Sequence, residues 1–165
     1  MDDGAMNLEL LTLHHAVSTF LAYETELLDS RDFHGWLDLF EEDGVYWVPT
    51  SRDQADMKTQ VSIMAEDKAL LGLRVERLGH PHAYSIEPHP ATVHLVGNIT
   101  VREEDGQIVA RSKLIVEELR EDRPTRWAGS VTHTLRRRGD GFGIVLKRVD
   151  LIQAGGTFTP ISIPL

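Results

Sequence analysis

The segment LLDSRDFHGWLDLFEEDGVYWVP, residues 27–49, decides the fold, because it joins the end of one helix, a short helix and the first strand. Leu27 and Leu28 close an apolar helical stripe, and Asp29-Ser30 combine a helix stop with a restart signal. Apolar side chains then recur at helical spacing at Phe33, Trp36, Leu37 and Phe40. This spacing predicts a second helix over about residues 32–40.

A turn signal follows that helix and starts a strand. Asp43-Gly44 reverses the chain into Val45-Tyr46-Trp47-Val48, which is rich in side chains that favour strands. Pro49 lacks a backbone N–H, so it limits how far this strand can pair.

Two further helices are predicted on either side of this segment. The first covers about residues 7–28, and the other covers about residues 67–78. Glu24 falls on the apolar stripe of the first helix, so we expect its carboxylate to have a buried partner, either an arginine or a backbone donor.

After Pro90 the pattern changes to a period of two, which is typical of strands. Asp105-Gly106 is a hairpin signal, and Arg123-Pro124-Thr125 predicts the next turn. Four strands follow, and one face of each is predicted to be mainly apolar. In the first strand this face holds Val93, Leu95, Ile99 and Val101, and in the second Ile108, Ala110, Ser112, Leu114 and Val116. In the third it holds Trp127, Gly129, Val131, His133 and Leu135, and in the fourth Phe142, Ile144 and Leu146. Gly97 and Gly129 permit bends or bulges in a long twisted strand. The order predicts an α+β fold, with N-terminal helices packed on one face of a strongly curved, mainly antiparallel sheet.

Composition limits the function classes. The chain has 165 residues, 41% of them apolar, which fits a single domain over residues 1–165, with residues 1–6 as a flexible N-terminus. There is no cysteine, so thiolate nucleophiles and cysteine-held clusters are excluded, and the composition is compatible with the cytoplasm. No apolar run approaches the length of a membrane span, so we expect no membrane partner.

The charge of the chain is unevenly distributed. Residues 1–60 hold three basic and thirteen acidic side chains, and the remainder holds fourteen basic and thirteen acidic ones; these balances of −10 and +1 sum to the total of −9. An acidic first third argues against nucleic-acid binding. The one basic cluster, Arg136-Arg137-Arg138, reads as a solvated strand end before the Gly139-Asp140-Gly141 turn.

Four blocks of the sequence, within about residues 16–165, resemble one family. The blocks are Leu27-Leu28-Asp29 with Phe33, Trp36-Leu37, Asp43 and Tyr46-Trp47-Val48-Pro49; a helix from Asp67 that ends Arg74-Val75-Glu76-Arg77-Leu78; the strand His94-Leu95-Val96-Gly97-Asn98; and a terminal hairpin with Gly141-Phe142, Ile144 and Lys147-Arg148-Val149-Asp150-Leu151. Together they resemble the small (β) subunit of aromatic-ring-hydroxylating dioxygenases, the Rieske non-haem iron oxygenases. The loop at residues 51–58 differs in character from the family pattern, and the segment 80–85 lacks an expected tryptophan.

This resemblance implies the cone-shaped fold of nuclear transport factor two-like proteins, also described as cystatin-like. It also implies a partner, the large (α) subunit, which carries the Rieske [2Fe–2S] cluster and a mononuclear iron, with a homotrimer of small subunits inside a mixed hexamer. The small subunit would then be structural, without catalytic residues and without a metal, flavin or nicotinamide of its own. The absence of cysteine agrees, because a Rieske centre needs two cysteines and two histidines.

A metal site is one alternative on the residues alone. His80, His82 and Glu87 have the spacing of a metal-binding motif, and His94 with Asn98 repeats the spacing of a second one. The glycines that accompany such motifs are missing, and the prolines at 81, 88 and 90 favour a loop rather than paired strands.

A cofactor-free enzyme is the second alternative, since cone folds also serve dehydratases, isomerases and cyclases that move a proton beside a carbonyl. The available parts are Asp43, Tyr46, His94 and His133. The alternation places His133 on the apolar face, where a histidine is more often a satisfied core residue, and turns His94 away from the apolar set, towards solvent or a partner. A ligand-binding module without chemistry is a third possibility.

Overall fold

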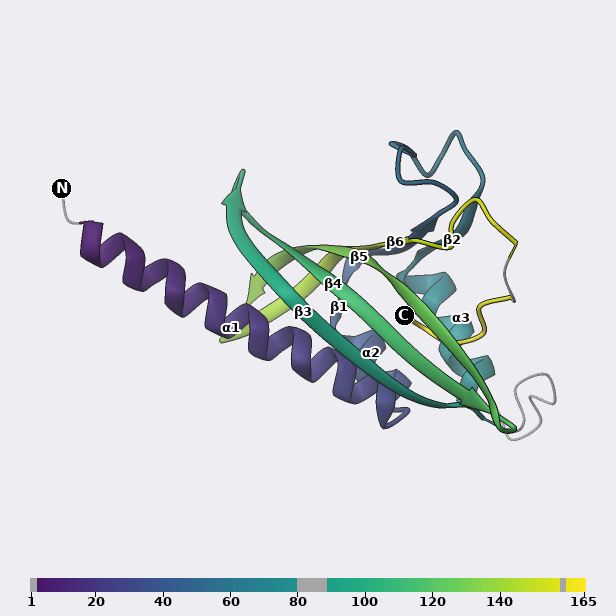
Figure 1. Cartoon of the computed structure of the whole chain (residues 1–165). Helices are drawn as coiled ribbons and strands as arrows, with labels where there is room; N and C mark the ends of the chain where they lie inside the picture. Colours follow the sequence, from purple (N-terminus) through teal and green to yellow (C-terminus); the bar gives the residue numbers. More distant parts are fainter. Residues whose placement is uncertain (1–2, 80–88, 158–159) are drawn as a thin grey trace.

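The computed structural model describes residues 3–79, 89–157 and 160–165, with nine elements in an α+β arrangement (Figure 1). The helices are α1 (Asp3–Asp29), α2 (Phe33–Asp38) and α3 (Lys68–Gly79). The strands are β1 (Phe40–Pro49), β2 (Ser62–Asp67), β3 (Ala91–Glu104), β4 (Gln107–Arg120), β5 (Arg123–Arg138) and β6 (Gly141–Leu151). The three predicted helices and the mainly antiparallel sheet are confirmed, and α1 begins four residues earlier than predicted.

The six strands form one curved sheet in the order β2-β1-β6-β5-β4-β3. All neighbours are antiparallel except β1 and β6, which run parallel, with Tyr46 opposite Lys147 and Trp47 opposite Arg148. The sequence pattern missed β2, a short strand whose apolar residues do not alternate cleanly, and gave no sign of the parallel pair. That pair joins β1, the first strand in the sequence, to β6, the last one.

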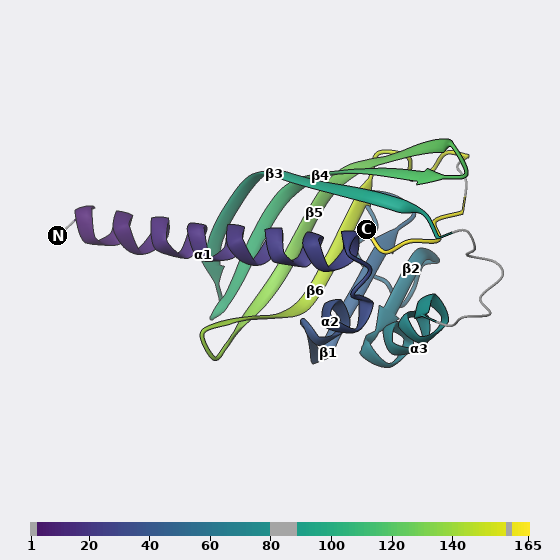
Figure 2. The same cartoon turned by 90° about the horizontal axis from the view of Figure 1, so that it is seen from below.

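The helices lie on one side of the sheet, and α1 crosses the strands β3 to β6 (Figure 2). Val17, Leu21, Leu27 and Leu28 of α1 are buried in the shared core. In the same core, α2 carries the fully buried Trp36, whose ring meets Phe40 and Tyr46 edge to face at 5.1 and 5.7 Å between centroids. The segment that decides the fold therefore supplies the aromatic centre of the core.

Of the four predicted turns, two are confirmed, one is shifted, and the one at Asp43-Gly44 is wrong, because both residues lie inside β1 at its register shift against β6. Asp105 and Gly106 have φ values of 50° and 77°, the left-handed pair that a tight hairpin requires, and Gly139 has a φ of 57°. The turn predicted at Arg123-Pro124-Thr125 instead lies at Glu121 and Asp122, with φ of 46° and 62°, and Pro124 pairs with Leu119 inside the ladder. Proline is tolerated there because it is close to the end of the strand.

The alternation predicted for β3 is wrong over its first half. The register of β3 on β4 shifts between Gly97 and Thr100, and Asn98 has a φ of 51°. This bulge, which Gly97 was predicted to permit, moves each later side chain to the other face of the sheet. Val93 and Leu95 therefore face outward, 63% and 64% exposed, instead of sharing a face with Ile99 and Val101.

Candidate functional site

A buried polar cluster lies inside the cone and is centred on Glu24 of α1. Glu24 Oε1 accepts hydrogen bonds from Lys147 Nζ at 2.7 Å and Trp36 Nε1 at 3.1 Å, and its Oε2 accepts one from His133 Nε2 at 2.9 Å. The residues Glu24, His133 and Lys147 are each at most 3% exposed. The carboxylate does have buried partners, as its position on the apolar stripe predicts, but they are a lysine, a histidine and an indole instead of an arginine or a backbone donor.

The charge of this cluster is internally balanced. Burial by itself raises the pKa of Glu24, but the nearby charges of Lys147 and His133 and their hydrogen bonds outweigh burial and hold its pKa well below its ordinary value. Glu24 is therefore an anion when folded, and the Lys147 ammonium also lies 5.8 Å from the centre of the Trp36 ring. A carboxylate held in this way is a poor general base, because its affinity for a proton is low.

His94 belongs to a second cluster, around Asp29 at the C-terminal end of α1. Its Nδ1 donates to Asp29 Oδ1 at 2.6 Å, its backbone N donates to Asp29 Oδ2 at 3.0 Å, and Thr92 Oγ1 donates to the same carboxylate at 2.9 Å. The Nε2 of His94 lies 3.3 Å from the carbonyl oxygen of Pro164. His94 is 8% exposed, so the prediction that it faces away from the core is wrong. The bulge at Gly97 and Asn98 explains the error, because the alternation was read without it.

The side chains of Tyr46 and Asp43 form hydrogen bonds with other protein groups. Tyr46 is fully buried and its hydroxyl oxygen accepts a hydrogen bond from the backbone N of Leu165 at 3.1 Å; burial raises its pKa. Asp43 lies on the surface and receives two hydrogen bonds from Arg136, at 3.1 and 3.0 Å, and this pairing lowers its pKa. The four residues proposed for a cofactor-free enzyme thus lie in four different settings and do not share a site.

The described interior of the cone is filled by side chains. Its fully buried members are mostly aromatic and branched, and include Trp36, Trp127, Tyr46, Phe40, Leu21, Leu28, Leu135 and Ile144. Beside His94, a small, partly open cavity of about 20 Å³ is lined by Leu28, Phe33, Leu78 and Ile163. That volume holds about one water molecule.

Most residues of the alternative metal site lie outside the described structure. No group of three or more His, Asp or Glu side chains that could hold a metal occurs among the described residues. Of the motif residues, His80, His82 and Glu87 lie outside the described residues, while His94 is bonded to Asp29 and Asn98 sits exposed in the β3 bulge.

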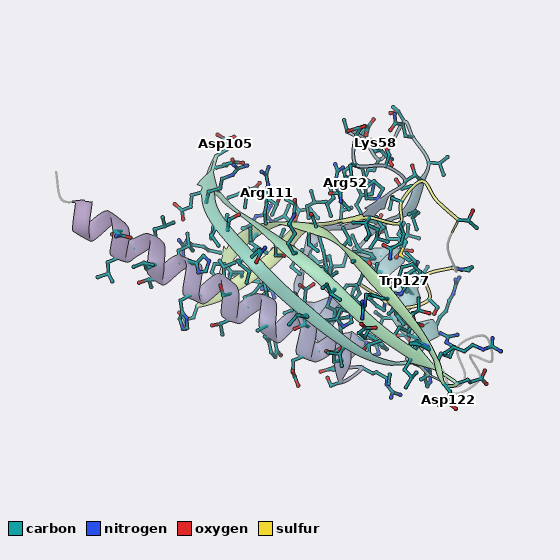
Figure 3. All side chains as sticks on the ribbon, viewed as in Figure 1. Arg52, Lys58, Asp105, Arg111, Asp122 and Trp127 are labelled. Carbon is teal, nitrogen blue, oxygen red and sulfur yellow. The ribbon has the colours of Figure 1, made fainter. Side chains whose placement is uncertain are left out.

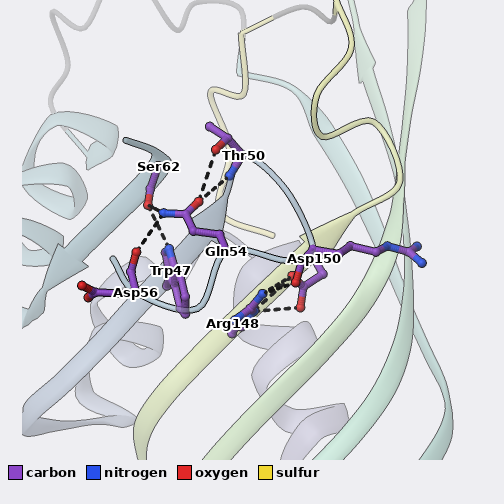
Figure 4. Close-up of polar contacts among 8 residues, drawn as sticks. Trp47, Thr50, Gln54, Asp56, Ser62, Arg148 and Asp150 are labelled. Carbon is purple, nitrogen blue, oxygen red and sulfur yellow. Dashed lines mark hydrogen bonds and ion pairs between the residues drawn. The ribbon is translucent and has the colours of Figure 1, made fainter. Parts of the chain in front are cut away.

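The loop between β1 and β2 is ordered by a buried amide, which the sequence did not reveal. Gln54 is 2% exposed; its Oε1 accepts from Thr50 N and Oγ1, and its Nε2 donates to Ser62 Oγ and to the carbonyl oxygens of Asp56 and Gln60 (Figure 4). Arg148 stacks 4.3 Å over the Trp47 ring and donates to the carbonyl oxygen of Arg52. The loop therefore holds Arg52 in a fixed place at the edge of the sheet.

The sequence matches one known protein family over most of its length. The family model described as "Ring hydroxylating beta subunit" matches residues 23–155. The chain is 35% identical over 140 residues to the small subunit of anthranilate 1,2-dioxygenase from Acinetobacter baylyi, covering 81% of this chain and 86% of that protein.

Solved structures agree on the fold. A naphthalene 1,2-dioxygenase structure with indole in its active site matches with a TM-score of 0.81 and 18% identity, over 93% of this chain and 86% of the matched chain. An NTF2-like protein with a cystatin-like fold from Novosphingobium aromaticivorans matches with a TM-score of 0.66 and 21% identity, over 94% of each chain. The predicted cone fold is confirmed. Among the described residues no helix has the length and hydrophobicity needed to cross a membrane.

Proposed function

The chain belongs to the family of ring-hydroxylating β subunits, and we infer from this that it is the structural small subunit of an aromatic-ring-hydroxylating dioxygenase. Its relatives bear the names of small subunits, so a large subunit is its partner. The stand-alone dehydratase or cyclase is not favoured, since the four residues it needs lie apart.

The observation that carries the structural role is how the interior polar groups are used. Glu24 is surrounded by Lys147, His133 and Trp36, and Asp29 is surrounded by His94 and Thr92. A general acid or base must face substrate, whereas Glu24 and its partners face one another in the packed interior, and Asp29, whose side chain is 24% exposed, is bonded to His94 and Thr92. We propose that the chain has no catalytic residue and acts as one domain over its 165 residues.

The metal chemistry is assigned to the partner. We propose that the large subunit holds a Rieske [2Fe–2S] cluster and a mononuclear iron, and that three small and three large subunits form the mixed hexamer. In support, the chain has no cysteine and could not supply the two thiolates of a Rieske centre. A cytoplasmic location stays a prediction.

Co-expression with a Rieske-type large subunit from a neighbouring gene tests the function. We expect the two chains to co-elute as a mixed oligomer, with iron and ring oxidation present only in the mixture. A stable homodimer that does not bind the large subunit would contradict the proposal.

His133→Ala tests the non-catalytic role within the assembled enzyme. We expect lower stability and an unchanged turnover number per folded complex, because His133 contacts only protein groups in the interior. The exposed His34→Ala is the matched control for stability. A large loss of turnover with folding unchanged would overturn the structural role.

A further inference from the structure

The outer face of the sheet, opposite the helices, exposes apolar side chains. Val93 and Leu95 of β3, Ile115 and Leu119 of β4, and Ile152 after β6 are 41% to 64% exposed. The ladder places Leu95, Ile115 and Ile152 together, since Leu95 pairs with Ile115, Ile115 with Ala128, and Ile152 N donates to the carbonyl oxygen of Ala128. Val93 lies opposite Glu117, which stands between Ile115 and Leu119 and is ion-paired with Arg126. We call these five residues the apolar patch. An exposed apolar patch with charged neighbours marks an interaction surface.

A cationic groove continues the same face. It is an open groove of about 630 Å³ lined by Arg52, Arg111, Lys113 and Arg148, with Asp150 as its one acidic residue. Arg148 is paired with Asp150, while no described carboxylate forms an ion pair with Arg52, Arg111 or Lys113. Arg111 and Arg52 point away from the helix side of the sheet (Figure 3). This face is therefore positive in a chain whose net charge is −9.

Two such faces would not pack on one another. A two-fold contact between sheets would bring Arg52, Arg111 and Lys113 of both copies together, and like charges in an interface oppose association. The occupant of this face must instead be apolar and acidic.

The N-terminal end of α1 has that character. All of residues 7–12 are exposed, with Leu8, Leu10 and Leu11 at 65%, 51% and 59%. This end of the helix projects beyond the sheet in both views (Figures 1 and 2). Residues 1–30 contain six acidic side chains and no lysine or arginine, and Glu9 stands among the leucines. We call residues 7–12 the arm.

We propose that the arm of one copy docks on the outer sheet face of a second copy, with its leucines on the apolar patch and Glu9 towards Arg111 and Lys113. A helix end with no tertiary packing is marginally stable in water, so docking would also stabilise the arm. The contact joins two different surfaces, so it is head-to-tail, and its repetition gives a ring of identical copies where the rotation closes. The proposal deepens the proposed function and rests on it for the presence of large subunits, but the contact itself involves this chain alone.

Disulfide trapping tests the contact directly, because the cysteine-free chain lets single cysteines be placed without background. Leu11→Cys and Ile115→Cys variants are purified separately, mixed and oxidised. We expect a cross-linked pair in the mixture and far less in either variant alone. The control is Leu11→Cys mixed with Leu73→Cys, which is 58% exposed on α3. Equal cross-linking in the control mixture would overturn the proposal.

Native mass of charged variants separates the possible occupants. The arm variant is Leu8→Glu with Leu11→Glu, and the sheet variant is Leu95→Glu with Ile115→Glu; circular dichroism checks that both fold. We expect each to lose the wild-type oligomer alone and to form a dimer when mixed, since one intact contact remains. Persistence of the oligomer in the arm variant, as in sheet-to-sheet pairing, would overturn the proposal.

The large subunit is the other possible occupant. The arm-to-sheet contact would also be overturned by two results together. These are a wild-type chain that stays monomeric by itself, and an arm or sheet variant that fails to bind the large subunit. Either result leaves the small-subunit function standing if the wild-type chain still co-elutes with an active large subunit. Failure of that co-elution would instead count against the proposed function.

Discussion

At the scale of single residues, Glu24 is the side chain on which the interior depends. One carboxylate compensates the Lys147 ammonium, the His133 imidazole and the Trp36 N–H. Removing a single partner from a buried ion pair is costly, because it leaves the other charge in a medium of low polarity. The cluster is therefore a point of high sensitivity even though its net contribution to stability is small.

Glu24→Gln is expected to lower the free energy of unfolding by about 3–5 kcal/mol, since it leaves Lys147 buried without its counter-charge. Urea unfolding at neutral pH measures the change, with the exposed Glu26→Gln as control on the same helix.

The dependence of unfolding free energy on pH gives a second test of Glu24. The pKa of Glu24 is lower in the folded chain than its ordinary value of 4.5, so its stabilisation is complete above about pH 5 and is lost as pH falls below it. The free energy of unfolding of Glu24→Gln should therefore fall less at acid pH than that of the wild type. An equal fall in both proteins would contradict the assignment of a low pKa to Glu24.

At the scale of elements, the shape of the sheet depends on where backbones come close. A Cβ at Gly129 of β5 would overlap the carbonyl oxygen of Asp150 on β6, whereas a Cβ at Gly97 of β3 would meet no atom within 4 Å. Both glycines permit curvature in the sequence pattern, but they do so in different ways: Gly97 adjoins a bulge, and Gly129 allows two strands to approach.

Gly129→Ala is therefore expected to destabilise the fold by about 1–3 kcal/mol, through displacement of β6. Gly97→Ala is the matched control and should change stability by less than about 0.5 kcal/mol, because its added methyl group has free space. Thermal unfolding of the two variants side by side measures the difference. Equal effects would show that the β5–β6 approach has no special cost.

The β1–β2 loop offers a prediction of local order. Gln54→Ala removes the amide that joins Thr50, Asp56, Gln60 and Ser62, so the loop should open more often while the sheet remains folded. Limited trypsin digestion should then cleave after Arg52 and Lys58 severalfold faster than in the wild type. Gln60→Ala, which removes only an exposed side chain, is the control. An unchanged cleavage rate would mean that Gln54 does not hold the loop.

At the scale of the whole molecule, the cone is a packed scaffold that presents outer surfaces. Its end near Tyr46 and His94 is covered by residues 161–165, with Ile163 and Leu165 buried. A scaffold of this kind tolerates replacement of its polar core by apolar residues of similar volume, which a catalytic pocket does not.

The combined variant Glu24→Met, His133→Leu and Lys147→Met tests that difference. The three ionisable partners are removed together and only the buried Trp36 N–H loses its acceptor, so we expect a free energy of unfolding well above that of Glu24→Gln. The assembled dioxygenase should retain its activity. Loss of activity in a stably folded, fully assembled variant would reveal a catalytic use of the cluster.

The sequence by itself determined the three helices, the long antiparallel strands, the α+β class and the family, because these follow from local periodicity, turn residues and short motifs within residues 27–49 and 67–151. It also placed Glu24 and His133 in the interior, since each lies on an apolar face. Tertiary structure alone decided that these two meet, because they are 109 positions apart and no local pattern encodes the contact. It also decided which way His94, Val93 and Leu95 point, since a bulge at Gly97 and Asn98 reverses the alternation from which a strand's faces are inferred.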